Sequence, residues 1–239
     1  MAEAELPLLV FEPKFLLYEV FKQKYGHKFR FTNSWDYSSH LSKVPGYETI
    51  QAVVCNGMSP LNKEAMEKLP ALRMIADVST GYNNIDLEEC RRRGISVSYA
   101  ASLAAEDVAE TAVSLLLDVM RKTSVADRFV RQGRWLVEGE CRLLGSKLGG
   151  KRVGLVGLGR IGTEIAKRLE PFGCRISYTS RAEKQSVLYT YVSDAEELAS
   201  QNDILIICCA LSDTTYHMIN RKVLLALGKG GVVVNVGRL

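Results

Sequence analysis

Three glycines at positions 157, 159 and 162 stand between an apolar run and a helix-forming segment. A strand that turns into a helix in this way presents backbone N–H groups to which a phosphate can bind. Gly157 would permit the tight turn, Gly159 would let the backbone approach a pyrophosphate, and Gly162 would let helix and strand pack closely. A second strand follows about 20 residues later, as in a dinucleotide-binding βαβ unit. The alternative is a glycine-rich turn without a ligand. We expect a cofactor site formed by Gly157, Leu158, Gly159, Arg160, Ile161 and Gly162.

The residues after that second strand indicate which cofactor would bind. An NAD site places a carboxylate here to bind the ribose 2′-hydroxyl. This chain instead has Ser180 and Arg181, and a guanidinium suits the oxygens of a 2′-phosphate. The sequence therefore favours NADP(H) over NAD(H). In the alternative interpretation, Arg181 is solvated and Glu183 reaches the ribose.

A single arginine, Arg238, follows the apolar run GVVVNV near the end of the sequence. In an open parallel sheet, ligands bind beyond the carboxyl ends of the strands. We therefore expect Arg238 near the reactive end of the cofactor, with Val236 and Gly237 beside it. The alternative is a solvated terminal arginine.

Alternating strands and helices position these residues. From residue 8 to residue 98, apolar strand-like runs alternate with helical segments, and a second alternation begins near residue 151. This order predicts an α/β fold with parallel sheets covered on both faces. We expect an α/β substrate-binding domain over residues 1–100 and an NADP-binding Rossmann-type domain over residues 101–239.

A long helix is expected at residues 106–122, with acids in its first turn and bases in its last. We interpret it as a link between the two domains. Its apolar residues Val108, Ala112, Leu115, Leu116 and Val119 lie near one face.

Composition excludes several other classes of protein. The formal net charge of +4 is spread along 239 residues, which is too little for a nucleic-acid-binding surface. The longest apolar run is far too short to cross a membrane, so we expect no membrane partner. The six cysteines have no CxxC or Cys/His spacing, which predicts no metal site and a reducing, cytoplasmic location.

Several segments in order along the chain resemble the D-isomer-specific 2-hydroxyacid dehydrogenases, and among these the plant-type glyoxylate/hydroxypyruvate and hydroxyphenylpyruvate reductases. The segments are VSTGYNNIDLEECRRRGI (78–95), DVAETAVSLLLDVMR (107–121), ADRFVRQGRW (126–135), GKRVGLVGLGRIG (150–162), FGCRISYTSR (172–181), NDILIICCALSDTTYHMIN (202–220) and VVVNVGR (232–238). Together they span nearly the whole sequence.

The resemblance implies a flavodoxin-like substrate domain, a Rossmann-type domain, and an active site between them in which a nicotinamide cofactor reduces a small 2-oxo acid. It also implies that Arg238 is the catalytic, substrate-binding arginine and that backbone N–H groups around Thr80 and Gly81 hold the substrate carboxylate. A full-length homodimer is implied as well.

The sequence departs from the family pattern after Arg238. The family continues with further strands and with a glutamate and a histidine, the histidine protonating the substrate oxygen. Here the three histidines, His27, His40 and His217, all precede Arg238, and we expect none of them to be catalytic. The Rossmann-type domain is therefore expected to lack its C-terminal strands. Two hypotheses follow: an NADPH-dependent reductase of glyoxylate, hydroxypyruvate or a related 2-oxo acid, or a non-catalytic truncated product that binds NADP(H) or pairs with full-length subunits.

Overall fold

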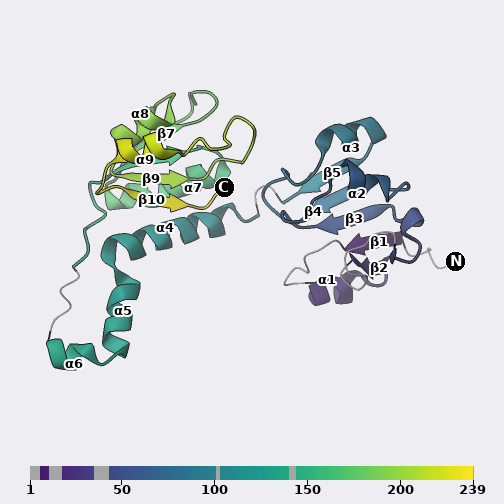
Figure 1. The fold of residues 1–239 in the computed structure, drawn as a ribbon, viewed down its shortest axis with the longest axis horizontal. Coiled ribbons are helices and arrows are strands. Elements are labelled where there is room, and N and C mark those ends of the chain that lie inside the picture. The colour runs from purple at the N-terminus through teal and green to yellow at the C-terminus, as the bar shows by residue number, and fades with distance from the viewer. Residues whose placement is uncertain (1–5, 11–17, 35–42, 101–102, 140–143, 239) are drawn as a thin grey trace. The chain divides into compact units, whose positions relative to one another are not determined.

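The computed structural model describes residues 6–10, 18–34, 43–100, 103–139 and 144–238. The chain divides into two compact units, Met1–Leu103 (unit 1) and Ala104–Leu239 (unit 2). Each unit contains one parallel sheet with helices, so the predicted α/β class is confirmed (Figure 1).

Unit 1 has the strand order β2-β1-β3-β4-β5, which is the flavodoxin-like order. The strands are β1 (Leu6–Val10), β2 (Phe29–Asn33), β3 (Ala52–Cys55), β4 (Met74–Asp77) and β5 (Ser96–Tyr99), and all described pairs are parallel. The helices are α1 (Tyr18–Tyr25), α2 (Lys63–Glu67) and α3 (Leu87–Arg93), and a 3-10 turn covers Tyr47–Thr49. One apolar core, which includes Leu9, Met66 and Ile75, joins the sheet to α2 and α3.

The side chains of the N-cap residues fix where α2 and α3 begin. The Asn62 side chain accepts a hydrogen bond from the N–H of Ala65, and the Asp86 side chain accepts one from Glu89. These bonds satisfy N–H groups that have no partner inside a helix. Gly94 ends α3 in the left-handed conformation, with φ of 67°. Local sequence therefore sets the boundaries that turn the chain back into β5.

Unit 2 has the strand order β10-β9-β6-β7-β8, so β6, the first strand of this unit in the sequence, lies in the centre of the sheet. The strands are β6 (Arg152–Val156), β7 (Arg175–Thr179), β8 (Thr190–Tyr191), β9 (Ile204–Ile207) and β10 (Val232–Asn235), all parallel to their described neighbours. The helices are α4 (Ala105–Arg121), α5 (Thr123–Arg131), α6 (Arg134–Glu138), α7 (Arg160–Leu169), α8 (Ala195–Ser200) and α9 (Arg221–Leu227), and a 3-10 turn covers Glu170–Phe172.

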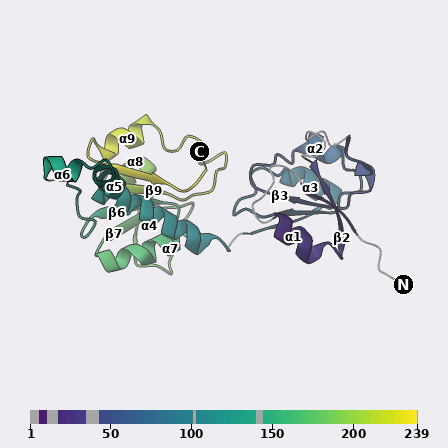
Figure 2. The ribbon, with the colours of Figure 1, turned by 90° about the horizontal axis from the view of Figure 1, so that it is seen from below.

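Helices cover both faces of this second sheet. Figure 2 shows α4 and α7 on one side of β6 and β9, and α8 and α9 on the other. One core joins Ala112 and Leu116 of α4 to Ile165 of α7 and to the sheet, and a second core joins Leu198 of α8 and Val223 of α9 to the opposite face. The central strands β6 and β9 are buried on both faces, which explains their nearly continuous apolar sequences.

The apolar residues that lie near one face of the long helix are not all buried. Its buried residues are Ala105, Ala109, Ala112, Leu116 and Met120. Leu115 is 46% exposed and Val119 is 52% exposed. The helix is apolar around much of its circumference, so the period of 3.6 residues does not determine which side meets the sheet.

Candidate functional site

The turn after β6 is built around Gly157. Its φ of 101° lies in the region that side chains rarely adopt, and its N–H donates to the carbonyl of Thr179 at 2.9 Å. A β-carbon here would lie 2.8 Å from the backbone N and Cα of Cys209. A β-carbon on Gly162 would meet the carbonyl oxygen of Gly157. Both glycines are therefore required by close backbone contacts within the protein.

Gly159 differs from the other two glycines. It has φ of −79°, and a β-carbon added to it would have nothing else of the described chain within 4 Å. Gly159 is the N-cap of α7, and no side chain caps that helix start. The first N–H groups of a helix have no partner within the helix. Open space therefore lies at a helix N-terminus suited to a pyrophosphate.

The remaining predicted residues of this turn contribute in different ways. Leu158 is buried in the core, and Ile161 is partly buried against it. Arg160 is exposed at the first position of α7. Leu158 and Ile161 can therefore face a cofactor mainly through their backbone, whereas the Arg160 side chain is accessible.

Ser180 and Arg181 follow β7 at the same end of the sheet as the glycine turn. The Ser180 hydroxyl donates to the carbonyl of Ala182 at 2.6 Å, and the Tyr191 hydroxyl donates to the carbonyl of Ser180 at 3.3 Å. These bonds fix the turn. Arg181 and Glu183 are both exposed, so the structure leaves both side chains accessible to a ligand.

The end of β10 lies beside the end of β9. The N–H groups of Val236 and Gly237 both donate to the carbonyl of Ile207, at 3.0 and 3.1 Å. A β-carbon on Gly237 would lie 3.0 Å from the carbonyl oxygen of Cys209. Arg238 is half-buried and follows directly. The carboxyl ends of β10, β9, β6 and β7 thus bring together Gly237, Gly157 and Ser180 along one edge, as in cofactor sites of open parallel sheets.

Unit 1 carries the predicted carboxylate-binding loop after β4. Thr80 is exposed and Gly81 is half-buried. No described residue accepts a hydrogen bond from the N–H of either residue. The hydroxyl of Ser79 donates to the carbonyl of Gly81 at 2.7 Å. The loop thus offers two successive N–H donors, a geometry that binds anions.

Residues 113–238 match the family model described as D-isomer specific 2-hydroxyacid dehydrogenase, NAD binding domain. This range contains the glycine turn, Ser180, Arg181 and Arg238. The chain belongs to this dehydrogenase family. Family membership shows that unit 2 carries a nicotinamide-dinucleotide-binding domain of an oxidoreductase.

Plant relatives are similar to this protein over most of the chain. A glyoxylate/hydroxypyruvate reductase of Arabidopsis thaliana is 50% identical over 188 residues, which are 79% of this chain and 58% of that protein. A hydroxyphenylpyruvate reductase of Plectranthus scutellarioides is 42% identical over 191 residues, covering 80% of this chain and 60% of the relative. The chain thus spans less than two thirds of the length of these relatives.

A solved structure is similar over both units of the chain. An NADPH-dependent glyoxylate/hydroxypyruvate reductase from Sinorhizobium meliloti, in complex with NADP and malonate, has a TM-score of 0.89 and 31% identity. The comparison covers 98% of this chain and 72% of that chain. The similarity supports the observed fold of both units.

The sequence did not identify Cys208 as a residue that contacts the turn around Gly157. Its thiol donates to the carbonyl of Gly157 at 2.9 Å. Burial, with a smaller contribution from Cys209, raises the pKa of the Cys208 thiol to about 12, so the thiol stays neutral and able to donate. The two residues are 51 positions apart in sequence, and no local motif joins them.

The histidines lie in different surroundings. His27 is exposed in the turn after α1, and His217 is exposed with its ring stacked on Tyr216 at a centroid distance of 3.9 Å. His40 lies outside the described residues.

The described residues contain neither a candidate metal site nor a candidate membrane-spanning helix. No cluster of His, Cys, Asp and Glu side chains there could hold a metal ion. No helix in the same part of the chain is long and apolar enough to span a membrane.

Proposed function

We propose that this protein is an NADPH-dependent reductase that converts glyoxylate, hydroxypyruvate or a related 2-oxo acid to the 2-hydroxy acid. The observation that carries the proposal is the turn after β7, where Ser180 and the exposed Arg181 stand in place of a ribose-binding carboxylate. A guanidinium can form two charge-assisted hydrogen bonds with a 2′-phosphate. The relatives named above support the substrate class.

Each predicted residue has a part in this proposal. Gly157 and Gly162 shape the turn, and the open position at Gly159 admits the pyrophosphate to the N-terminus of α7. The bound nicotinamide would supply the hydride that reduces the substrate carbonyl. Arg238 would bind the substrate and polarise that carbonyl, with Val236 and Gly237 beside the cofactor. In unit 1, the N–H groups of Thr80 and Gly81 would bind the substrate carboxylate.

We also infer a homodimer, supported by an exposed apolar surface on α5 and α6. Both helices extend away from the sheet of unit 2 (Figure 1). Leu136 is 91% exposed and Val137 is 86% exposed, and Val130 and Trp135 are more than half exposed. Contiguous apolar surface of this kind is typical of association sites. We further propose a cytoplasmic location, on the basis of the cysteine spacing.

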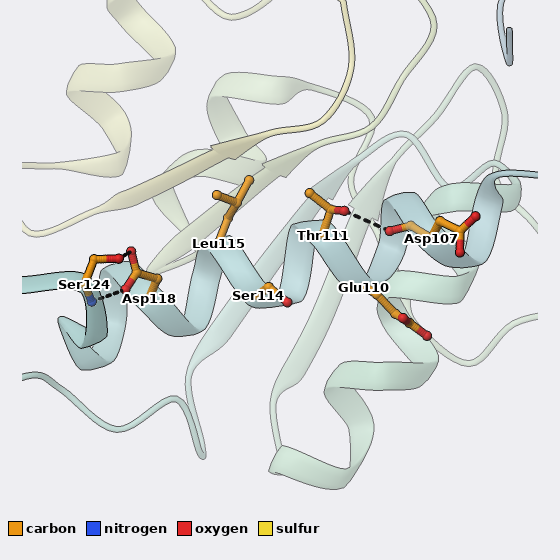
Figure 3. A pocket seen from close by; sticks show the side chains of 7 residues that line it. All are labelled: Asp107, Glu110, Thr111, Ser114, Leu115, Asp118 and Ser124. Atoms are coloured by element: carbon orange, nitrogen blue, oxygen red, sulfur yellow. Dashed lines mark hydrogen bonds between the residues drawn. The ribbon is translucent and has the colours of Figure 1, made fainter. Parts of the chain in front are cut away.

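Two hydrogen bonds fix the start of α5 against α4. Figure 3 shows Ser124 beside the carboxylate of Asp118 and Leu115 among the polar residues of α4. Ser124 donates from its N–H at 2.6 Å and from its hydroxyl at 2.8 Å. Hydrogen bonds from the Ser124 backbone and side chain lower the pKa of Asp118, so it stays ionised as a cap. The direction in which α5 leaves α4 is thereby set.

Thermal unfolding with each cofactor tests the proposal. A ligand that binds the folded state raises the melting temperature according to its concentration relative to its dissociation constant. NADPH should raise the melting temperature more than NADH at equal concentration, and Arg181→Asp should reduce NADPH affinity about tenfold or more. Arg175→Asp makes the same charge change at the opposite end of β7 and should leave the preference intact.

Turnover distinguishes the reductase from a cofactor-binding chain. The assay measures NADPH oxidation by absorbance, with glyoxylate and with hydroxypyruvate as substrates. NADPH binding without turnover would favour the non-catalytic alternative. An equal or larger stabilisation by NADH would contradict the proposed cofactor preference.

A further inference from the structure

A buried carboxylate lies beneath the loop that carries Thr80 and Gly81, here called the 78–84 loop. Asp77, at the end of β4, is 3% exposed. One of its oxygens, Oδ1, accepts from the N–H of Ser79 at 2.7 Å, and the other, Oδ2, accepts from the Asn84 amide at 3.0 Å. Both ends of the loop are therefore attached to the same side chain.

Asn84 also holds a second turn, formed by residues 56–59 after β3 and here called the 56–59 turn. Its side-chain amide nitrogen donates to the carbonyls of Asn56, at 3.2 Å, and Ser59, at 3.0 Å. The backbone carbonyl of Asn84 accepts from the N–H of Leu61 at 2.8 Å. One residue thus joins the chain after β3 to the chain after β4.

The surroundings of Asp77 fix the geometry of the 78–84 loop and thereby the positions of its N–H groups. The thiol of Cys55 lies against Asp77, and burial together with this carboxylate raises the pKa of the thiol, which keeps it protonated. The buried carboxylate therefore receives hydrogen bonds from Ser79 and Asn84 and lies against a neutral thiol. Both oxygens of Asp77 thus have a hydrogen-bond partner, and a buried carboxylate whose oxygens are both paired favours a single local geometry. The Ser79 hydroxyl donates a hydrogen bond to the carbonyl of Gly81, which fixes the position of Gly81 relative to Asp77.

We propose that Asn84 is a positioning residue which, through Asp77 and Ser79, holds the N–H groups of Thr80 and Gly81 in the geometry that binds a 2-oxo acid carboxylate. This inference rests on the proposed function. Asn84 itself does not contact the substrate. By tying the 56–59 turn to the 78–84 loop, it makes the two loops at the carboxyl ends of β3 and β4 move as one body.

The test uses oxamate, a non-reducible isostere of a small 2-oxo acid, with the full 239-residue chain saturated with NADPH. Amide NMR signals of Thr80 and Gly81 report binding at the loop, and the melting temperature reports folding. In the wild-type chain, oxamate should shift both signals. Asn84→Ala should weaken oxamate binding about tenfold or more, because N–H groups of Thr80 and Gly81 that are displaced lose most of their contribution to carboxylate binding. NADPH affinity should stay within about twofold of wild type, because the NADP site belongs to unit 2.

Arg93→Ala is the matched control. The Arg93 guanidinium donates to the carbonyls of Leu69 and Pro70, at 2.7 and 3.3 Å, near the amino ends of the strands. Removing it also deletes hydrogen bonds to backbone carbonyls, but it should leave oxamate binding unchanged. Ser79→Ala removes the hydroxyl that donates to Gly81 and keeps the backbone N–H that donates to Asp77. It should weaken oxamate binding in the same direction, so it tests the inference even if Asn84→Ala does not fold.

The outcomes separate this inference from the proposed function. If wild type binds oxamate and both Asn84→Ala and Ser79→Ala bind it equally well, the positioning role is wrong while the carboxylate site stands. If oxamate does not shift the Thr80 and Gly81 signals of wild type, the proposed carboxylate site is wrong, and the positioning role is wrong with it. Equal weakening by Arg93→Ala would show a general effect of stability and would also contradict the inference.

Discussion

A β-carbon on Gly162 would collide with the carbonyl oxygen of Gly157, so α7 can approach the preceding turn because residue 162 has no side chain. The Cys208 sulfur would lie 3.1 Å from the same β-carbon. Forcing a methyl group into a packed interior typically costs about 1–3 kcal/mol. We therefore expect Gly162→Ala to lower the free energy of unfolding by about that amount in denaturant titrations. If Gly162→Ala were as stable as wild type, the predicted clash with the carbonyl oxygen of Gly157 would be wrong.

Gly159→Ala should show the opposite behaviour. The backbone conformation at residue 159 suits alanine, and the methyl group would point into open space. We expect the melting temperature without cofactor to stay close to that of wild type. A pyrophosphate that approaches this backbone would meet the methyl group, so NADPH affinity should fall about tenfold or more, or ~1.4 kcal/mol. Unchanged affinity, measured by calorimetric titration, would show that the cofactor does not pass over Gly159.

The contrast between these glycines shows what the sequence could and could not predict. Spacing was sufficient to place the turn between β6 and α7, because a strand, a tight turn and a helix must follow one another locally. The bond from Cys208 to Gly157 joins different strands and has no local signal. The network of Asp77 and Asn84 likewise depends on the arrangement of β3 and β4 in the folded sheet.

Helix α4 shows a second limit. Its apolar residues exceed the number needed for one buried stripe, so the helical period places Leu115 and Leu116 near the same face. The structure buries Leu116 and leaves Leu115 nearly half exposed. Contact with the sheet and α7 decides which side of α4 is buried, and the helical period of the sequence does not reveal that contact. Sequence therefore predicted the element but not its orientation.

Acid should remove a stabilising contact between β6 and β9. Hydrogen bonds from the Arg152 side chain and backbone lower the pKa of Asp203 from 3.8 to about 2. Because the pKa is depressed in the folded state, this contribution is complete above pH 3.8 and is lost as the pH falls toward 2. Both side chains are partly exposed, so screening limits the contribution to about 1 kcal/mol. Asp203→Asn should therefore lower the free energy of unfolding at pH 7 and make that free energy fall less steeply below pH 4. Asp213→Asn, at an exposed position, should leave both the value at pH 7 and the slope unchanged.

Glycine should be better tolerated than alanine at residue 217. The φ of 54° at His217 is in the left-handed region, which costs a residue with a side chain on the order of 1 kcal/mol. His217→Gly and His217→Ala both lose the ring stacking on Tyr216, but only glycine relieves the backbone strain. We therefore expect the free energy of unfolding of His217→Gly to exceed that of His217→Ala by about 0.5–1 kcal/mol in denaturant titrations. Equal stabilities of the two variants would show that the backbone conformation at residue 217 has no measurable cost.

The apolar surface on α5 and α6 should control association of the protein. Leu136 and Val137 are almost fully exposed, and burying such side chains contributes about 1.5–3 kcal/mol each. A dimer formed through this surface would have to bury a carboxylate if either residue became glutamate, which is costly without a partner. Light scattering after size-exclusion chromatography should therefore show a dimer for wild type and a monomer for Leu136→Glu, with an unchanged melting temperature at low protein concentration. Leu188→Glu is the matched control, because Leu188 is equally exposed but lies in the loop between β7 and β8. A wild-type monomer, or a dimer that survives Leu136→Glu and Val137→Glu together, would show that α5 and α6 do not form the interface.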